Sequence, residues 1–226
     1  MNPRIALVTG ATGELGAAIA QRLVALRHQV VLAARNDAAA RTLADELGAG
    51  TRWVNMDVTD AASVAAAAKT VDHVDIVINN AGVLLDDGDC AATVNLELVE
   101  RTLAVNTVGA WRVAQAFLPG MLDRGWGRVV NVSSGTASFT RGLFPGAPAY
   151  SLSKVGLNAV TVLLAQATSG RGVLVNAINP GRVRTRMQPD APRAPDEAAV
   201  DVVAVATLPD GPTGQFLRAG SEVMPW

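Results

Sequence analysis

The stretch Ile5-Ala-Leu-Val-Thr-Gly-Ala-Thr-Gly-Glu-Leu-Gly16 decides the fold. It opens with a short apolar run, passes through a glycine-rich turn and enters an Ala- and Leu-rich segment that extends to residue 26. A continuous apolar run of strand length indicates burial on both faces, as in a parallel sheet covered by helices on each side. The stretch therefore predicts a strand, a tight turn and a helix in direct succession.

The same alternation continues along the chain. Runs rich in Val, Ile and Leu predict strands at residues 5–9, 29–34, 52–56, 74–79, 128–133, 173–179 and 214–217. Ala- and Leu-rich stretches predict helices at 15–26, 38–47, 61–71, 96–122 and 149–168, and one more that begins at 195. We expect a break or kink in the long stretch at residues 106–109. Repeated strand–helix alternation is typical of a doubly wound parallel sheet, the Rossmann fold of the α/β class, here as a single domain over residues 1–226.

The composition favours a folded domain and excludes several kinds of site. Of the 226 residues 50% are hydrophobic and 17% are charged, and the formal net charge of −1 gives no overall attraction for nucleic acid or an anionic membrane. Cys90 is the only cysteine, which excludes an intrachain disulfide and a cysteine-cluster metal site, and we expect no bound metal. No segment approaches the ~20 apolar residues of a membrane span, and the first residues lack the zones of a signal peptide. We therefore expect a cytoplasmic protein that binds neither nucleic acid nor membrane.

The glycine-rich turn predicts a dinucleotide site. Gly10, Gly13 and Gly16 lie between the first strand and the first helix, together with Thr12 and Leu15. Glycines let the backbone approach a pyrophosphate, and the N-terminus of the following helix supplies free N–H groups and a partial positive charge. An ordinary tight turn between strand and helix is the alternative interpretation.

The end of the second strand indicates which dinucleotide binds. An acid at this position holds the ribose 2′-hydroxyl of NAD, whereas an arginine nearby accommodates the 2′-phosphate of NADP. The strand ends at Ala34 and Arg35 follows it, while Asp37 lies farther on, where we expect it to cap the next helix. The sequence thus predicts that NADP(H) is preferred over NAD(H). A solvated surface cation is the alternative role for Arg35.

Tyr150-Ser-Leu-Ser-Lys154 contains the only tyrosine of the chain. In a helix, positions i and i+4 share a face, which places the phenol beside the ammonium. A phenol normally keeps its proton up to a pKa of ~10, and we expect the cation of Lys154 to lower that pKa. A phenol tuned in this way can donate or accept a proton near neutral pH, as carbonyl reduction requires.

Two hydroxyls, those of Ser133 and Ser134, follow the strand at 128–133. Open α/β sheets bind ligands at the carboxyl ends of their strands, so both serines are candidates for a ligand site. Residues 136–148 and the Pro-rich residues 186–195 are expected to form loops over the substrate.

In this order and spacing the motifs resemble the short-chain dehydrogenase/reductase family. The tail, with Gly211-Pro-Thr-Gly-Gln-Phe-Leu and Met224-Pro-Trp226, resembles the end of that family's carbonyl reductase-like members. The resemblance implies that Ser134 rather than Ser133 is the catalytic serine. It implies that Tyr150 donates the proton, that Lys154 holds the cofactor ribose, and that Asn106 holds a water that relays protons from the lysine. It also implies further cofactor contacts, in the Asp57-Val58 pair, in Asn79-Asn80-Ala81-Gly82 through Asn80 and Gly82, and after the Pro-Gly turn at Val183 and Thr185.

The glycine loop departs from the commoner pattern of that family. The spacing Thr-Gly-x-x-x-Gly-x-Gly would place a glycine at position 14, where this chain has Glu14. The glycines at 10, 13 and 16 match instead the spacing of the family's extended branch. Because a carboxylate aimed at a pyrophosphate would repel it, we expect Glu14 to point to solvent in the first helical turn, where an acid is tolerated.

The sequence as a whole predicts reduction of a ketone or aldehyde to an alcohol with NADPH, and Tyr150 as proton donor. Oxidation of a secondary alcohol and a non-catalytic NADP-binding sensor are the alternatives. The expected partner is a small carbonyl or alcohol substrate, and family resemblance implies a homodimer or homotetramer.

Overall fold

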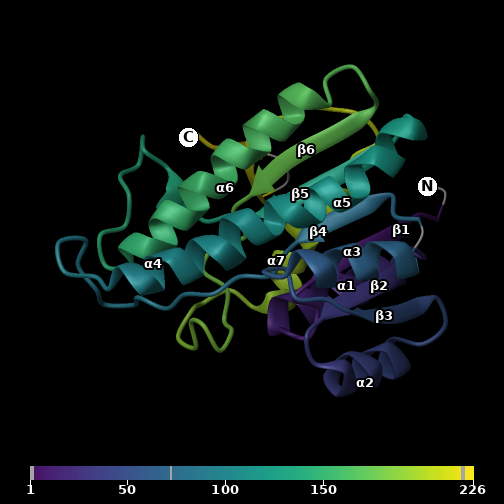
Figure 1. Ribbon diagram of the computed structural model, residues 1–226, viewed down its shortest axis with the longest axis horizontal. Coiled ribbons are helices and arrows are strands. Elements are labelled where there is room, and N and C mark those ends of the chain that lie inside the picture. Colours follow the sequence, from purple (N-terminus) through teal and green to yellow (C-terminus); the bar gives the residue numbers. More distant parts are fainter. Residues whose placement is uncertain (1–2, 72, 220–221) are drawn as a thin grey trace.

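The computed structural model describes residues 3–71, 73–219 and 222–226, and these form one sheet of eight strands with helices on both faces (Figure 1). The strand order is β3-β2-β1-β4-β5-β6-β7-β8, parallel from β3 to β7, with β8 antiparallel to β7. The strands are β1 (Ile5–Thr9), β2 (Gln29–Ala34), β3 (Thr51–Asn55), β4 (Ile76–Asn79), β5 (Gly127–Val132), β6 (Val173–Ile178), β7 (Phe216–Arg218) and β8 (Glu222–Val223). The doubly wound α/β fold is confirmed, and the chain reverses its direction of winding between β1 and β4.

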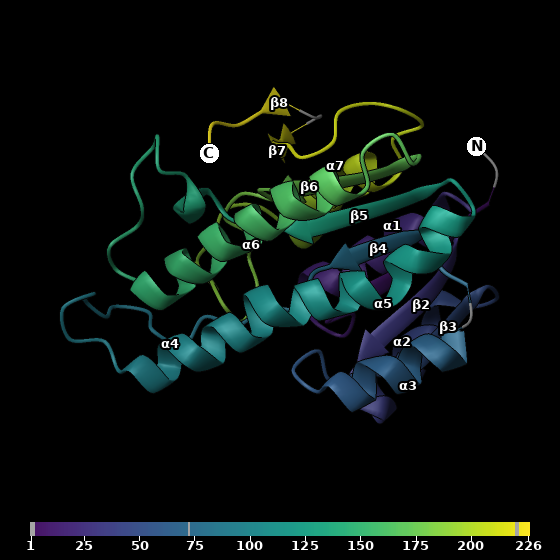
Figure 2. The ribbon, with the colours of Figure 1, turned by 45° about the horizontal axis from the view of Figure 1, so that its top comes forward.

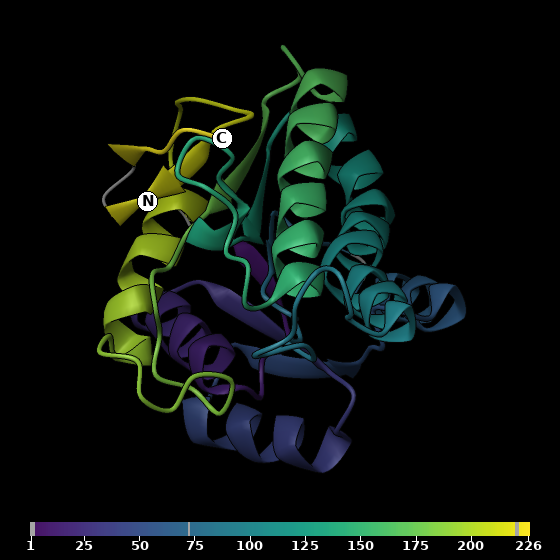
Figure 3. The same ribbon diagram turned by 90° about the vertical axis from the view of Figure 1, so that its left-hand side faces the viewer.

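The helices cover the sheet in two layers. They are α1 (Glu14–Ala25), α2 (Asp37–Leu47), α3 (Ala61–Val71), α4 (Leu96–Leu103), α5 (Ala110–Asp123), α6 (Pro148–Ala167) and α7 (Pro195–Ala206). Figure 3 shows α1 and α7 on one side of the sheet and α5 and α6 on the other. A hydrophobic core lies on each face of the sheet, and successive residues of a strand point into opposite cores. Leu7 of β1 packs with α3, α5 and α6, whereas Val8 packs with α1 and α7.

Helices α4 and α6 extend side by side beyond the sheet, as Figures 1 and 2 show from two directions. The overhanging part of α6 contains its N-terminal turns. The face of α6 that carries Tyr150 and Lys154 thereby stands over the carboxyl ends of the central strands.

The long stretch predicted as one helix with a break is interrupted by a π-helical segment, η1 (Ala104–Gly109), between α4 and α5. The predicted irregularity at residues 106–109 is confirmed. Gly109 fits its position because a Cβ there would lie 2.8 Å from the Val58 side chain. Wider turns of this kind occur often at functional sites.

Two local predictions are wrong. The cap of α2 is Asn36, whose side chain accepts a hydrogen bond from the Ala39 N–H at 3.1 Å, while Asp37 is the first helical residue and accepts from Asn55 Nδ2 at 2.7 Å. The predicted final strand at 214–217 is β7, displaced by two residues at its start, and β8 was not expected. None of the helices described is long and apolar enough to span a membrane.

Candidate active site

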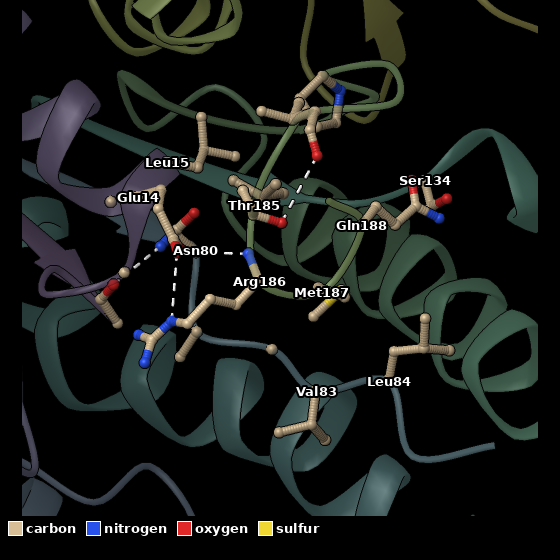
Figure 4. A pocket seen from close by; sticks show the side chains of 18 of the residues that line it. Glu14, Leu15, Asn80, Val83, Leu84, Ser134, Thr185, Arg186, Met187 and Gln188 are labelled. Carbon is tan, nitrogen blue, oxygen red and sulfur yellow. Dashed lines mark hydrogen bonds and ion pairs between the residues drawn. The ribbon is translucent and has the colours of Figure 1, made fainter. Parts of the chain in front are cut away.

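A cleft of ≈ 1310 Å³ opens at the carboxyl ends of the central strands. Ligand sites of open parallel sheets lie at this position. All the candidate residues from the sequence line it except Asn106: Gly10, Thr12, Gly13, Leu15, Gly16, Arg35, Asp57, Val58, Asn80, Gly82, Ser134, Tyr150, Lys154, Val183 and Thr185. Residues spread over the chain from position 10 to position 185 thus share one site, part of which Figure 4 shows.

Two glycines of the loop after β1 are fixed by close packing. Gly10 has φ +61°, and a Cβ on it would lie 2.9 Å from the Ala81 Cα. A Cβ on Gly16 would lie 2.9 Å from the Asn80 amide nitrogen. Gly13 is different, because the nearest atom to a Cβ there, the Gly10 carbonyl oxygen, lies 3.5 Å away. Packing within the protein therefore does not require a glycine at position 13. A close approach of a ligand to the backbone would explain why this position is a glycine.

Asn80 holds the glycine loop in shape. Its side-chain amide donates to the Thr9 carbonyl at 3.0 Å and the Gly10 carbonyl at 3.2 Å. The Thr9 hydroxyl in turn accepts from the backbone N–H groups of Asn80 and Ala81, both at 3.0 Å. The Asn-Asn-Ala-Gly motif thus joins β4 to the phosphate-binding turn predicted after β1.

Arg35 and Asp57 lie at the end of the cleft formed by β2 and β3. Arg35 is exposed, and among the described residues it takes part in no ion pair. The Asp57 carboxylate accepts from the Thr59 hydroxyl at 2.7 Å and from the Thr59 N–H at 2.8 Å, and these hydrogen bonds lower its pKa. The Asp37 carboxylate accepts from Asn55, and the guanidinium of Arg35 lines the cleft at the tip of β2.

Tyr150 and Lys154 lie together on α6, as the i, i+4 spacing predicts. The Lys154 ammonium is 5.5 Å from the centre of the Tyr150 ring and donates to the Val132 carbonyl at 2.8 Å. Burial lowers the pKa of Lys154 to about 8. The lysine therefore remains predominantly protonated at neutral pH and is fixed to the end of the strand that leads into Ser134.

The predicted lowering of the Tyr150 pKa by Lys154 is wrong for this structure. Burial raises the pKa of Tyr150 to about 12, and a hydrogen bond with the Ser134 side chain lowers it by a smaller amount. The ammonium lies 5.5 Å from the ring centre and donates to the Val132 carbonyl, and removal of the phenol from water is the largest cause of the raised pKa. Tyr150 is consequently a fully protonated phenol at neutral pH, the form that a proton donor needs.

The two neighbouring serines differ in their surroundings. Ser133 is buried and its hydroxyl donates to Asn158 Oδ1 at 2.7 Å. Both serines line the cleft, but Ser134 is less buried, and its hydroxyl accepts from the Thr136 hydroxyl at 3.0 Å. Ser134 therefore has access to a ligand.

Asn106 is buried in η1 and does not line the cleft. Its Oδ1 accepts from the Val83 N–H at 2.8 Å, and its amide nitrogen donates to the Val83 carbonyl and to the Ser153 hydroxyl, both at 2.9 Å. The side chain thus ties the loop after β4 to α6. Its implied part in a proton relay stays a prediction.

Glu14 is exposed in the first turn of α1, as expected, but it also lines the cleft and its carboxylate has a partner. Glu14 Oε1 accepts from the backbone N–H of Arg186 at 3.3 Å and from its Nε at 3.2 Å (Figure 4). The pair joins the glycine loop to the segment after β6 that contains Val183 and Thr185. The two residues are 172 positions apart, which explains why the sequence pattern gave no sign of this contact.

The structure adds cleft residues, all but Gln188 apolar, that the motifs do not name. Val83 and Leu84 follow β4, and Met187 with Gln188 lies in the segment after β6, all shown in Figure 4. Phe144 joins them from the predicted substrate loop 136–148. These positions carry no motif, and only folding brings them into the cleft that Tyr150 also lines.

Comparison with known proteins identifies the family. The model of the short chain dehydrogenase family matches residues 4–196. FabG of Aquifex aeolicus, a 3-oxoacyl-acyl-carrier-protein reductase, is 34% identical over 192 residues, covering 81% of this chain and 75% of that protein. The oxidoreductase UcpA of Salmonella typhimurium is 38% identical over 195 residues, covering 81% of this chain and 71% of that protein. The chain belongs to the short-chain dehydrogenase/reductase family and is an oxidoreductase of the kind that binds NAD(P).

Solved structures agree in fold over the full length. NADPH-bound carbonyl reductase from chicken fatty liver superposes with a TM-score of 0.89 at 27% identity, covering 100% of both chains. The carbonyl reductase Sniffer of D. melanogaster gives a TM-score of 0.92 at 22% identity, also covering 100% of both chains. The sequence resembles carbonyl reductase-like members of the family, and carbonyl reductases are also among the solved structures that this chain resembles.

Proposed function

We propose that this protein reduces a ketone or aldehyde to an alcohol with NADPH, and that Tyr150 donates the proton. The observation that carries the proposal is the phenol of Tyr150, kept protonated in the cleft, with Lys154 at its ring and Ser134 within hydrogen-bonding reach. A proton donor, a fixed cation and a hydroxyl converge where a carbonyl oxygen can be held.

The residues present fit a dinucleotide cofactor. The glycine loop exposes backbone at Gly13, next to the N-terminus of α1, as a pyrophosphate requires. The cleft exceeds the ~300–1,000 Å³ of an ordinary ligand site, so it has room for a dinucleotide and a substrate. Arg35 would pair with a 2′-phosphate, and the last residue of β2 is Ala34 rather than the acid that would select the 2′-hydroxyl of NAD. The NADPH-bound carbonyl reductase supports the same choice by analogy.

NADPH, when bound, supplies the hydride for the carbonyl carbon. The hydroxyls of Ser134 and Tyr150 orient the carbonyl oxygen and stabilise the charge that develops on it. Tyr150 then gives its proton to that oxygen. The ammonium of Lys154 would hold the cofactor ribose and would stabilise the phenolate that Tyr150 becomes.

Apolar side chains from the loop after β4 and from both predicted substrate loops line part of the cleft. Val83, Leu84, Phe144 and Met187 line it, and Phe144 and Met187 are exposed at its rim. Such a lining supports an uncharged carbonyl compound with a hydrophobic body as substrate.

The proposal is tested by NADPH consumption with a panel of apolar ketones and aldehydes, with NADH in parallel and Tyr150→Phe as the inactive control. Reduction of at least one compound, faster with NADPH than with NADH, is the expected result. Binding of NADPH without turnover of any compound, in either direction, would support the sensor alternative.

A further inference from the structure

Helix α6, which carries Tyr150 and Lys154, begins without a capping side chain of its own. Its N-cap residue is Ala147, which has no side-chain acceptor, and Pro148 at the first helical position has no N–H. The helical ladder starts with the Ser151 N–H, which donates to the Ala147 carbonyl at 2.9 Å. Two backbone N–H groups, those of Ala149 and Tyr150, therefore need an acceptor from elsewhere.

The carboxylate of Asp86 accepts from both groups. The Ala149 N–H donates to Oδ2 at 2.5 Å, and the Tyr150 nitrogen lies 3.3 Å from Oδ1 and 3.4 Å from Oδ2. Asp86 is only 1% exposed, and within the described part of the chain no cation forms an ion pair with it. A buried carboxylate needs such compensation, and the positive end of the α6 dipole adds to it. Asp86 and the start of α6 thus depend on one another.

The loop that carries Asp86 is fixed along its length to the rest of the site. Asn80 holds the glycine loop, the backbone of Val83 is bound by Asn106, and the Gly88 N–H donates to the Gly146 carbonyl at 2.8 Å. One short loop therefore connects the predicted cofactor-binding turn with the helix that carries the proton donor.

We propose that Asp86 is a positioning residue for the reductase reaction, one that sets the place of the Tyr150 phenol relative to the bound cofactor through the Tyr150 N–H. This inference rests on the proposed function. Asp86 touches no reacting atom and acts through the first turn of α6. Displacement of a catalytic group by about 1 Å costs on the order of 10²-fold in rate, so loss of the cap should lower kcat while cofactor binding is preserved.

The test compares Asp86→Ala and Asp86→Asn with Asp89→Ala. Asp89 lies in the same loop, outside the cleft, and its side chain makes no hydrogen bond or ion pair among the described residues. We expect kcat to fall about 10²-fold in Asp86→Ala. Asp86→Asn should retain about 10-fold more activity than Asp86→Ala, since the amide oxygen still accepts one N–H. The Kd of NADPH should stay within about twofold of the wild-type value in all three proteins, and Asp89→Ala should match the wild type in kcat.

Hydrogen exchange of the amides at residues 149–152 supplies a readout independent of turnover. Faster exchange there in both Asp86 variants, and unchanged exchange in Asp89→Ala, is the expected result. Wild-type kcat in Asp86→Ala, or losses of NADPH affinity as large as the losses of kcat, would overturn the inference. Asp86→Asn carries the same test if Asp86→Ala does not fold. If the wild-type protein turns over no carbonyl compound, the proposed function is contradicted. The capping contact is tested apart from turnover: amide exchange at residues 149–152 that stays as slow in the Asp86 variants as in the wild type would contradict it.

Discussion

Ser133 and Ser134 are neighbours in an extended segment, yet their hydroxyls serve different parts of the molecule. Both residues line the cleft, but the Ser133 hydroxyl donates to Asn158 on α6, whereas the Ser134 side chain forms a hydrogen bond with Tyr150. Successive side chains of an extended chain point to opposite sides, so this division follows from local geometry.

The division predicts opposite phenotypes for two matched substitutions. Ser134→Ala should lower kcat by about 10²-fold or more, because it removes a hydroxyl that orients the carbonyl oxygen, with little change in stability. Ser133→Ala should keep kcat and lose about 1–3 kcal/mol of unfolding free energy, because Asn158 Oδ1 loses its buried donor. Steady-state kinetics and urea denaturation of both variants check this. Reversed phenotypes would reassign the catalytic serine.

The dependence of kcat on pH should follow the protonation of Lys154. The pKa of Tyr150, about 12, keeps the phenol protonated throughout the working range, whereas Lys154 has a pKa of about 8. The ammonium is present below that value and lost as the pH rises through it, so kcat for reduction should fall above about pH 8. Lys154→Arg keeps its charge at higher pH, so the fall should move upward in that variant. A profile that is flat through this range, or identical in Lys154→Arg, would exclude this role of the ammonium.

Arg35 should determine the preference between the cofactors. Arg35→Asp removes the partner of a 2′-phosphate and introduces repulsion, so the affinity for NADPH should fall on the order of 10²-fold while that for NADH is kept. Arg171→Asp is the matched control, because Arg171 is exposed outside the cleft and the change in net charge is the same. Isothermal titration of both cofactors gives the comparison. Equal losses of affinity for NADPH and NADH would mean that Arg35 does not bind the 2′-phosphate.

The contact between Glu14 and Arg186 should have a small energetic effect. Both side chains are substantially exposed, at 40% and 84%, and exposed ion pairs contribute about 0–1 kcal/mol. Glu14→Gln should therefore change the Kd of NADPH by about fivefold or less, because the carboxylate is already paired with Arg186. Much tighter binding by Glu14→Gly would show that the carboxylate opposes the cofactor.

Much of the fold could be predicted because short stretches of the sequence determine it. Apolar runs and glycines mark β1, the turn after it and α1, and the spacing of Tyr150 and Lys154 describes one helix face. Contacts between distant segments carry no such pattern. The pair of Glu14 with Arg186 and the cap that Asp86 places on α6 appear only when the chain is folded. The pKa of Tyr150 was predicted in the wrong direction, because spacing shows a neighbouring cation but not the loss of water around the phenol.

The most direct test of the account is Tyr150→Phe, which removes the hydroxyl and keeps the ring beside Lys154. The account predicts that carbonyl reduction falls by about 10²–10⁴-fold while the Kd of NADPH changes little. Turnover close to that of the wild-type protein would show that another group donates the proton, and the proposed reaction at this site would be wrong.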